Sequence, residues 1–504
     1  MKAWLVIACT WSLSLQAQVS PDKLFSDNMV LQRDRPIRVW GKATPGQSVT
    51  VSFAGKSARV LTTKDSTWLI GLPAQPANTL PQDMTITSGP ETILLRNILI
   101  GDLWLCIGQS NMEFPMKAES HFTAALQDAD NNRLRWYNPT YIGKNVYATA
   151  FTDSMCRRLN KEDFYQGSWQ SSNAANLATM SAIGYYFGRR ITKEAGIPIG
   201  LIHLAIGGCP LETFADALAL SHSPQFAAKA SGNWLNNEAL PVWPRTRAHE
   251  HLGPACLAAM PSAPSTSGPD HAYKTGFAFE AGIRPLLSMP IRGILWYQGE
   301  SNAQEWDRVK EYKALLKWMI ADYRKKWAQP GMPFYWVQLS SIDTLHYRSQ
   351  YWPEFRDGQR SLLAEVRNGG MAVSSDVGAR DNVHPTDKRT VGERLARWAL
   401  HDVYGKKIMP CGPLPLRADY SSGRIRIRFQ YTGDSLQTSD DLPLRGCSID
   451  GKTDAAAVIS GKEVIIDHVR VKPAYVYYGW KPYTDANLVN KDRLPASTFK
   501  LKIH

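Results

Sequence analysis

The N-terminal part of the chain alternates apolar and polar positions over short stretches. At residues 48–53, Val49, Val51 and Phe53 alternate with Ser and Thr, a spacing that predicts a half-buried strand. Turn residues separate these stretches, so we expect a small β-sandwich over residues 18–97. Further short apolar runs lie at 37–40, 59–62 and 68–71.

From residue 98 the pattern changes to near-continuous apolar runs that alternate with long helical stretches. This alternation predicts an α/β fold whose parallel sheet is buried on both faces. Apolar positions at helical spacing predict one helix that ends at Gly196, another over 306–327, and a last one after His384 with Pro385 in its first turn. The expected strands lie at 102–107, 199–206, 292–297, 334–340 and 371–375.

These patterns divide the chain of 504 residues into consecutive domains. The α/β region is expected to form a domain over 98–405, within which residues 212–274 lack a clear period and are expected to cross the mouth of the sheet. After Gly405 the short strand pattern returns, so we expect a C-terminal β domain over 406–504.

The first residues have the form of a secretory signal peptide. Lys2 precedes an apolar stretch at 3–15, and small or polar residues follow. We therefore expect residues 1–17 to be a signal peptide and the protein to be secreted or periplasmic. No later segment has 18 uninterrupted apolar residues, so no membrane span is expected.

The amino-acid composition indicates which classes of ligand or partner to expect. The 58 basic and 45 acidic side chains give a net charge of +13, but no run of Lys and Arg concentrates it, so no nucleic-acid partner is expected. The 17 Trp and 20 Tyr residues are typical of sugar-facing or core surfaces. The cysteines after the signal peptide contain no C-x-x-C pair, so we expect no metal and no cofactor. Some of these cysteines could pair in an oxidising compartment, but their wide spacing defines no pairing, and buried free thiols are the simpler expectation.

Polar clusters follow the predicted strands, where ligands bind in open parallel sheets. Ser110 lies in a sharp turn after the first strand, where its hydroxyl and backbone amide would be free for nucleophilic chemistry; the alternative is a helix N-cap. Gly207 and Gly208 end the second strand and allow close backbone approach to a ligand. Gln298 to Asn302 end the third strand with two amides and the carboxylate of Glu300.

A serine nucleophile needs a base, and two histidines have an Asp three residues before them. Asp381 precedes His384, and Asp343 precedes His346. Both pairs follow predicted strands, and the carboxylate in each would fix the tautomer of the imidazole. The residues alone leave the choice between the two pairs open.

Four ordered motifs resemble those of a known family. They are Gly-Gln-Ser-Asn-Met at 108–112, Gly207–Gly208 followed by Glu212, Trp-Tyr-Gln-Gly-Glu-Ser-Asn at 296–302, and Asp381-x-x-His384-Pro385. In order and spacing they resemble the sialate O-acetylesterase branch of the SGNH (GDSL-like) hydrolases, as do the flanking stretches at 24–32 and 478–497. The resemblance implies an SGNH-type three-layer α/β/α core with a parallel sheet, flanked by N- and C-terminal β-sandwich segments.

The resemblance also implies roles. Ser110 would be the nucleophile, His384 the base and Asp381 its orienting carboxylate, with the backbone N–H groups of Ser110 and Gly208 in the oxyanion hole. The amide that completes this hole is either Gln298 or Asn302. Further oxyanion or substrate-binding candidates are Gln109, Asn111 and Glu300.

We therefore expect a secreted serine carbohydrate O-acetylesterase, a sialate O-acetylesterase, that releases acetate through an acyl-serine intermediate. The expected partner is an acetylated carbohydrate, either sialic acid or a hemicellulose. The alternatives are an acetylxylan or xyloglucan acetyl esterase and a non-catalytic carbohydrate-binding protein. A lipase or peptidase of the α/β-hydrolase type is disfavoured, because the chain contains no Gly-x-Ser-x-Gly motif.

Overall fold

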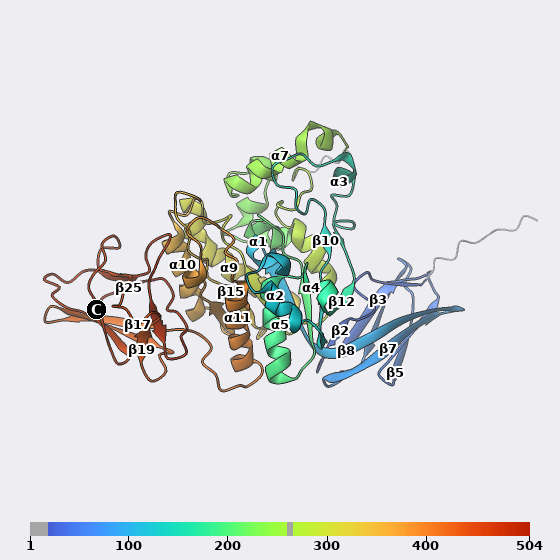
Figure 1. Ribbon diagram of the computed structural model, residues 1–504. Coiled ribbons are helices and arrows are strands. Elements are labelled where there is room, and N and C mark those ends of the chain that lie inside the picture. The colour runs from blue at the N-terminus through green and yellow to red at the C-terminus, as the bar shows by residue number, and fades with distance from the viewer. Residues whose placement is uncertain (1–18, 260–265) are drawn as a thin grey trace, which may run out of the picture.

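The computed structural model describes residues 19–259 and 266–504, so the predicted signal peptide at 1–17 lies outside the described residues. Along the chain, N-terminal β-sheets are followed by a central α/β region and then by C-terminal β-sheets (Figure 1). In the described part of the chain, no helix combines the length and the apolar character needed to cross a membrane.

A parallel sheet forms the centre of the α/β region, with strand order β12-β9-β13-β8-β14-β15-β16. The second half of β8 and the strands β13, β14 and β15 are largely apolar and wholly buried. Strands β9 and β12 are more polar and partly exposed, and β12 pairs antiparallel with β9. The five strands expected here are confirmed, whereas β9 and β12 were not predicted. The bounds are β8 Glu91–Gly108, β9 Asn131–Tyr137, β12 Trp169–Ser172, β13 Ile199–His203, β14 Gly293–Tyr297, β15 Phe334–Val337 and β16 Gly369–Ala372.

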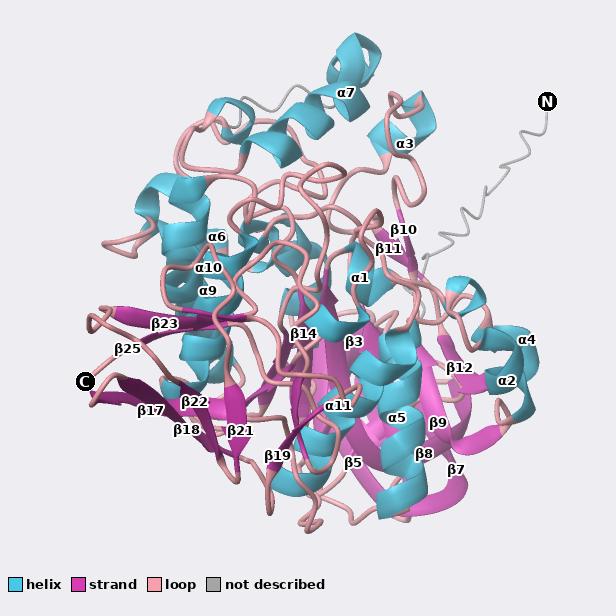
Figure 2. Cartoon of the chain, turned by 60° about the vertical axis from the view of Figure 1, so that its left-hand side comes forward, coloured by secondary structure: helices cyan, strands magenta, loops and turns pink. Residues whose placement is uncertain are grey.

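Helices cover both faces of this sheet. Helices α5 (Ala182–Ala195) and α11 (Lys388–Asp402) pack together on one face, where Tyr335 of β15 meets Trp398 of α11. Trp336, the next residue of the same strand, points to the opposite face and donates to the carbonyl of Gln359 on α10 (Trp352–Ser361). The expected three-layer fold class is confirmed (Figure 2).

Two of the predicted helices form as expected. Helix α5 ends at Gly196, whose φ of +71° closes the helix in the left-handed conformation, and α9 spans Trp306–Lys326. Helix α11 differs, because it begins at Lys388 and leaves Pro385 outside its first turn. The carboxylate of Asp387 caps this helix by accepting from the backbone N–H of Thr390, which fixes the later start.

The N-terminal strands are continuous with the central sheet. Strand β8 pairs with β7 at its beginning and with β13 and β14 at its end, so the boundary expected between residues 97 and 98 falls inside β8. Figure 1 shows this strand running from the N-terminal sheets into the core. The strands of the region are β1 Ser20–Pro21, β2 Val30–Gln32, β3 Ile37–Lys42, β4 Ser48–Phe53, β5 Lys56–Leu61, β6 Thr67–Leu72 and β7 Asn78–Ser88.

The C-terminal sheets enclose an apolar cluster of their own. Ile425 and Ile427 of β18 pack there with Val476 of β23 and Phe499 of β25. The strands are β17 Leu414–Ser421, β18 Arg424–Gln430, β19 Leu436–Thr438, β20 Cys447–Ser448, β21 Val458–Ser460, β22 Glu463–Ile466, β23 Tyr475–Tyr478, β24 Leu488–Asn490 and β25 Phe499–Lys502.

The segment at 212–274, expected to be irregular, contains short helical turns and the longer helix α7 (Val242–Ala259). A disulfide joins Cys256 of α7 to Cys156 of α3 (Asp153–Arg157). The sequence left such a pairing open, because the two segments meet only in the folded chain; Cys106, Cys209, Cys411 and Cys447 are buried free thiols. The other short elements are α1 Ser110–Glu113, α2 Phe122–Gln127, β10 Thr140–Tyr141, β11 Tyr165–Gln166, α4 Ala174–Leu177, α6 Ala217–Ser221 and α8 Arg284–Leu286.

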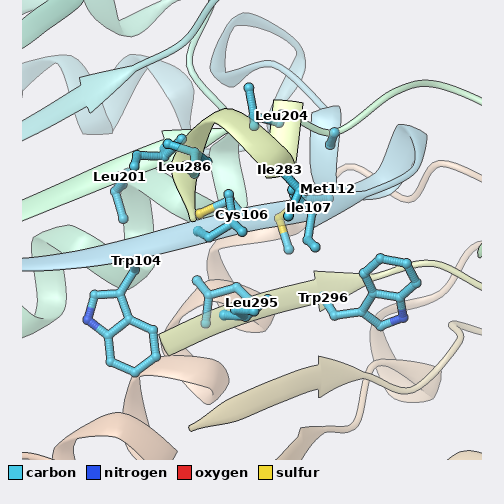
Figure 3. Packing of buried hydrophobic residues seen from close by; sticks show 14 of the residues in the cluster. Trp104, Cys106, Ile107, Met112, Leu201, Leu204, Ile283, Leu286, Leu295 and Trp296 are labelled. Atoms are coloured by element: carbon cyan, nitrogen blue, oxygen red, sulfur yellow. The ribbon is translucent and has the colours of Figure 1, made fainter. Parts of the chain in front are cut away.

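The largest apolar cluster lies between the sheet and its helices, as the close view of Trp104, Leu295 and Trp296 illustrates (Figure 3). These side chains come from the paired strands β8 and β14 and are fully buried. Their packing fixes the carboxyl ends of the two strands relative to each other, and those ends carry the polar motifs.

Candidate active site

Ser110 is the first residue of α1 and follows β8 after a tight turn. Gly108 makes this turn possible: its φ is +134°, and a Cβ there would lie 2.1 Å from the carbonyl oxygen of Tyr297. A larger residue would force β8 and β14 apart. The turn leaves Ser110 partly exposed, and it lines a cavity at the carboxyl end of the sheet.

His384 lies on the loop between β16 and α11, and its Nε2 is 2.7 Å from the Oγ of Ser110. Burial, together with the positive charge of Lys388, lowers the pKa of His384 to about 4. The imidazole is therefore neutral at neutral pH. With its ring hydrogen on Nδ1, it can accept the hydroxyl proton through Nε2, the arrangement of a nucleophile and its base.

The other candidate base lies elsewhere. His346 is exposed on the loop after β15 and does not line the cavity that contains Ser110. The structure therefore brings His384, and not His346, to the serine.

Asp381 does not make the contact expected from the sequence. It shares the loop of His384, but its side chain is exposed, and no hydrogen bond or ion pair joins the two within residues 19–259 and 266–504. A local turn accounts for the difference. The backbone N–H of His384 donates to Oδ1 of Asn382 at 2.8 Å, which leaves Asp381 directed to solvent.

Gly208 and the N-terminus of α1 supply free backbone donors. An ideal Cβ on the neighbouring Gly207 would lie 4.0 Å from the Cβ of Ser110, so the two loops are close. Gly208 has φ of +71°, and a Cβ there would lie 2.6 Å from the ring of Trp243, so only glycine fits. In the described part of the chain, the N–H groups of Ser110 and Gly208 have no acceptor.

The two amides expected to complete the oxyanion hole are engaged in a buried network. Gln298 donates through Nε2 to Oδ1 of Asn302 at 2.7 Å and accepts from the hydroxyl of Tyr312. Asn302 donates through Nδ2 to the carboxylate of Glu212 and accepts from the backbone N–H of Leu211. Neither side chain lines the cavity, so this pattern indicates that both amides support the strand end.

Gln109 differs from Gln298 and Asn302, because its amide nitrogen has no hydrogen-bond acceptor in the described part of the chain. Its Oε1 accepts from the backbone N–H groups of Gly299 and Ser301, each at 3.3 Å. These donors fix the orientation of the amide, since a reversed amide would place its NH₂ against two N–H groups. Its Nε2 has no acceptor among the described residues, and Gln109 lines the cavity beside Ser110.

Asn111 and Glu300 lie behind the serine instead of in the cavity. Asn111 is fully buried and donates through Nδ2 to Oε1 of Glu300 at 2.6 Å and to the carbonyl of Val383 at 3.0 Å. Its Oδ1 accepts from the Nζ of Lys388 at 2.5 Å. These contacts join three loops of the site, and the sequence motifs gave no sign that Lys388 was part of them.

The cavity of about 210 Å³ above Ser110 has aromatic walls. Trp243, Arg247 and Tyr273 come from the segment at 212–274, and Tyr147 comes from the loop before α3. The guanidinium of Arg247 lies 5.6 Å from the centre of the Trp243 ring. Sequence reasoning missed these residues, because the segments that carry them have no apolar period; their aromatic residues were the available signal.

One group of side chains in the described chain has the geometry to hold a metal ion: Glu119, His121 and Asp387. None of them lines the cavity with Ser110. The carboxylate of Glu119 already accepts from the hydroxyl of Tyr186 and the backbone N–H of His121.

Comparisons with known proteins find similarity to carbohydrate acetylesterases. Residues 279–401 match the family described as carbohydrate esterase, sialic acid-specific acetylesterase. The sialate O-acetylesterase of Rattus norvegicus is 29% identical over 81% of this chain and 78% of its own length, and that of Homo sapiens is 28% identical over 81% and 75%. A carbohydrate acetylesterase structure from Xanthomonas citri has a TM-score of 0.76 and 29% identity over 96% of this chain and 99% of its own. The resemblance expected from the sequence is confirmed.

Proposed function

We propose that this chain, a carboxylic ester hydrolase of the sialate O-acetylesterase type, removes O-acetyl groups from carbohydrates with Ser110 as nucleophile and His384 as base. The observation that carries the proposal is the 2.7 Å separation between Oγ of Ser110 and Nε2 of His384 at the carboxyl end of the sheet. Glycines that no larger residue can replace hold both neighbouring loops in this position.

The reaction then proceeds in two steps. Oγ of Ser110 attacks the acetyl carbonyl carbon while Nε2 of His384 takes the hydroxyl proton. The bond from that carbon to the sugar oxygen breaks, and His384 returns the proton to the sugar. Water, deprotonated by His384, attacks the acetyl-serine and releases acetate, and the proton returns to Oγ.

The developing oxyanion needs donors already directed at it. The free N–H groups of Ser110 and Gly208 supply two, as the resemblance implies. We assign the third to Nε2 of Gln109, in place of Gln298 or Asn302, because its amide lines the cavity and has no other acceptor in the described structure. Asp381 is kept as the proposed orienting carboxylate because it shares the loop of His384.

The charge of the cavity bears on the substrate. Arg247 is the only Lys or Arg among the described lining residues, and its Nη1 pairs with the exposed Glu250 at 2.7 Å. Burial raises the pKa of Glu113, the one carboxylate among those lining residues. A cation beside an aromatic wall favours a sugar that carries a carboxylate, such as an acetylated sialic acid. Acetylated hemicellulose, a neutral polymer, is the alternative.

We also propose that the protein acts outside the cytoplasm. The form of residues 1–17 supports secretion or export to a periplasm. The disulfide between Cys156 and Cys256 is of the kind that forms in an oxidising compartment.

Acetate release tests the function. Wild-type protein is incubated with acetylated sialosides and with acetylated xylan and xyloglucan, and Ser110→Ala is the matched control. We expect acetate from the sialosides and less than a few per cent of that rate from Ser110→Ala. Faster release from xylan selects the hemicellulose alternative, and release unaffected by Ser110→Ala refutes the nucleophile. No release from any substrate, with binding retained, selects a carbohydrate-binding protein.

A further inference from the structure

We propose that Lys388, which does not line the substrate cavity, is a positioning residue that holds the His384 loop against Ser110 through Asn111. The inference rests on the proposed function and adds a residue to it. The motifs at the strand ends did not suggest this role for Lys388, which is buried.

The side-chain amide of Asn111 connects the elements that carry the nucleophile, the base and Lys388. Asn111 directly follows Ser110, and its Nδ2 binds the carbonyl of Val383, the residue before His384, at 3.0 Å. The same amide accepts from the Nζ of Lys388 at 2.5 Å and donates to Glu300 at 2.6 Å. Asn111 therefore ties the loop of the base to the helix of the nucleophile, and Lys388 and Glu300 hold Asn111 from its two ends.

Lys388 occupies a place that disfavours a cation. It is 1% exposed and is the first residue of α11, where the helix dipole repels positive charge. Burial lowers the pKa of Lys388 to about 7. The rings of Phe114 and Tyr297 lie 4.7 Å and 6.0 Å from its Nζ, which offsets part of the lost hydration. An apolar side chain would fill this site at less cost, so packing alone does not account for a lysine.

The charges around Lys388 also bear on the base that it positions. Glu300 after β14, Asp387 at the helix cap and Glu119 favour the charged form of Lys388. Lys388 is the charged residue that acts on His384 and lowers its pKa, in addition to burial. Arg247 of α7 and Glu113 of α1 line the same cavity, and Asp381 shares the loop. The ammonium therefore opposes a second positive charge on the imidazole.

The test separates positioning from charge with three variants. Lys388→Met keeps the length of the side chain but removes the hydrogen bond and the charge, Lys388→Arg keeps the charge, and Asn111→Ala keeps Lys388 but removes the tether. Arg389→Met is the matched control, because it removes an exposed cation from the next position of the same helix. The measurements are kcat and KM for acetate release and the pH dependence of kcat/KM.

We expect Lys388→Met and Asn111→Ala to lower kcat about 10²-fold at nearly unchanged KM, because a displaced base no longer meets the hydroxyl in line. The acid limb of kcat/KM rises by about one pH unit in Lys388→Met and stays in place in Lys388→Arg and Asn111→Ala. Arg389→Met behaves as wild type. Should Lys388→Met not fold, the kcat of Asn111→Ala and the acid limb of Lys388→Arg decide the question.

The inference is overturned if Lys388→Met loses thermal stability but keeps kcat and the acid limb of wild type, since that describes a structural residue. If Lys388→Met does not fold, wild-type kcat in Asn111→Ala, or a raised acid limb in Lys388→Arg, overturns it instead. Failure of the proposed function looks different, because Ser110→Ala and His384→Ala would then retain activity.

Discussion

Replacement of Gln109 by Glu changes one end of a side chain and preserves the other. The carboxylate still accepts from the backbone N–H groups of Gly299 and Ser301, whose bonds to Oε1 are 3.3 Å long. The NH₂ group is replaced by an oxygen that cannot donate and that can carry a negative charge. The scaffold of the strand end is therefore retained while the proposed third oxyanion donor is lost.

The expected size of the effect follows from that loss. Removal of a single oxyanion donor costs about 10²–10³ in kcat, or about 2.7–4 kcal/mol of transition-state stabilisation. A negative charge facing the oxyanion adds repulsion, so Gln109→Glu belongs at the upper end of this range. KM changes little, because the ground-state carbonyl carries less charge than the tetrahedral intermediate.

The assay is steady-state release of acetate, with thermal unfolding measured in parallel. Gln298→Ala and Asn302→Ala are the comparison variants, since both amides are bound to neighbours in the buried network. We expect these two to lower the unfolding temperature, because each removes hydrogen bonds from buried partners; Asn302→Ala, for example, removes the donor to Oε2 of Glu212. Near-wild-type kcat in Gln109→Glu, together with a loss of about 10²-fold or more in a stably folded Gln298→Ala or Asn302→Ala, would refute the assignment.

Three further predictions concern the base and the disulfide. His384→Ala should nearly abolish turnover, Asp381→Asn should slow it through loss of the proposed orienting carboxylate, and His346→Ala should have little effect. Measurement of kcat for each variant gives this ranking. An essential His346 would contradict the assignment of His384 as the base. The pKa of His384 is lowered to about 4, so kcat/KM should fall only as the pH drops towards 4 and the base becomes protonated. An acid limb near the unperturbed ~6.5 would contradict the buried neutral imidazole. Cys156→Ser opens a loop of 100 residues, so it should lower the free energy of unfolding by about 2–4 kcal/mol. Denaturant titration measures this change, and an unchanged midpoint of the unfolding transition would show that the cross-link adds no stability.

The sequence determined the architecture of the sheet and the side of it that carries chemistry. Continuous apolar runs identify a buried parallel strand because both of its faces are covered, and five such runs were correctly placed. Polar residues directly after those runs lie at one edge of the sheet, since parallel strands end together. On that basis Ser110 and Gly208 were expected at that edge, where the structure places them beside the cavity. The residues alone left the choice between His384 and His346 open, and only the family resemblance favoured His384.

Tertiary structure alone decided how the side chains at that edge pair. The amides of Gln298 and Asn302 look available in the sequence, but Glu212, about ninety positions away, binds Asn302 at 3.0 Å. The pairing of Lys388 with Asn111, 277 positions away in the sequence, and the disulfide of Cys156 also depend on contacts between distant segments. Periodicity reports the face on which a residue lies, whereas these pairings depend on which distant loops the packed core brings together.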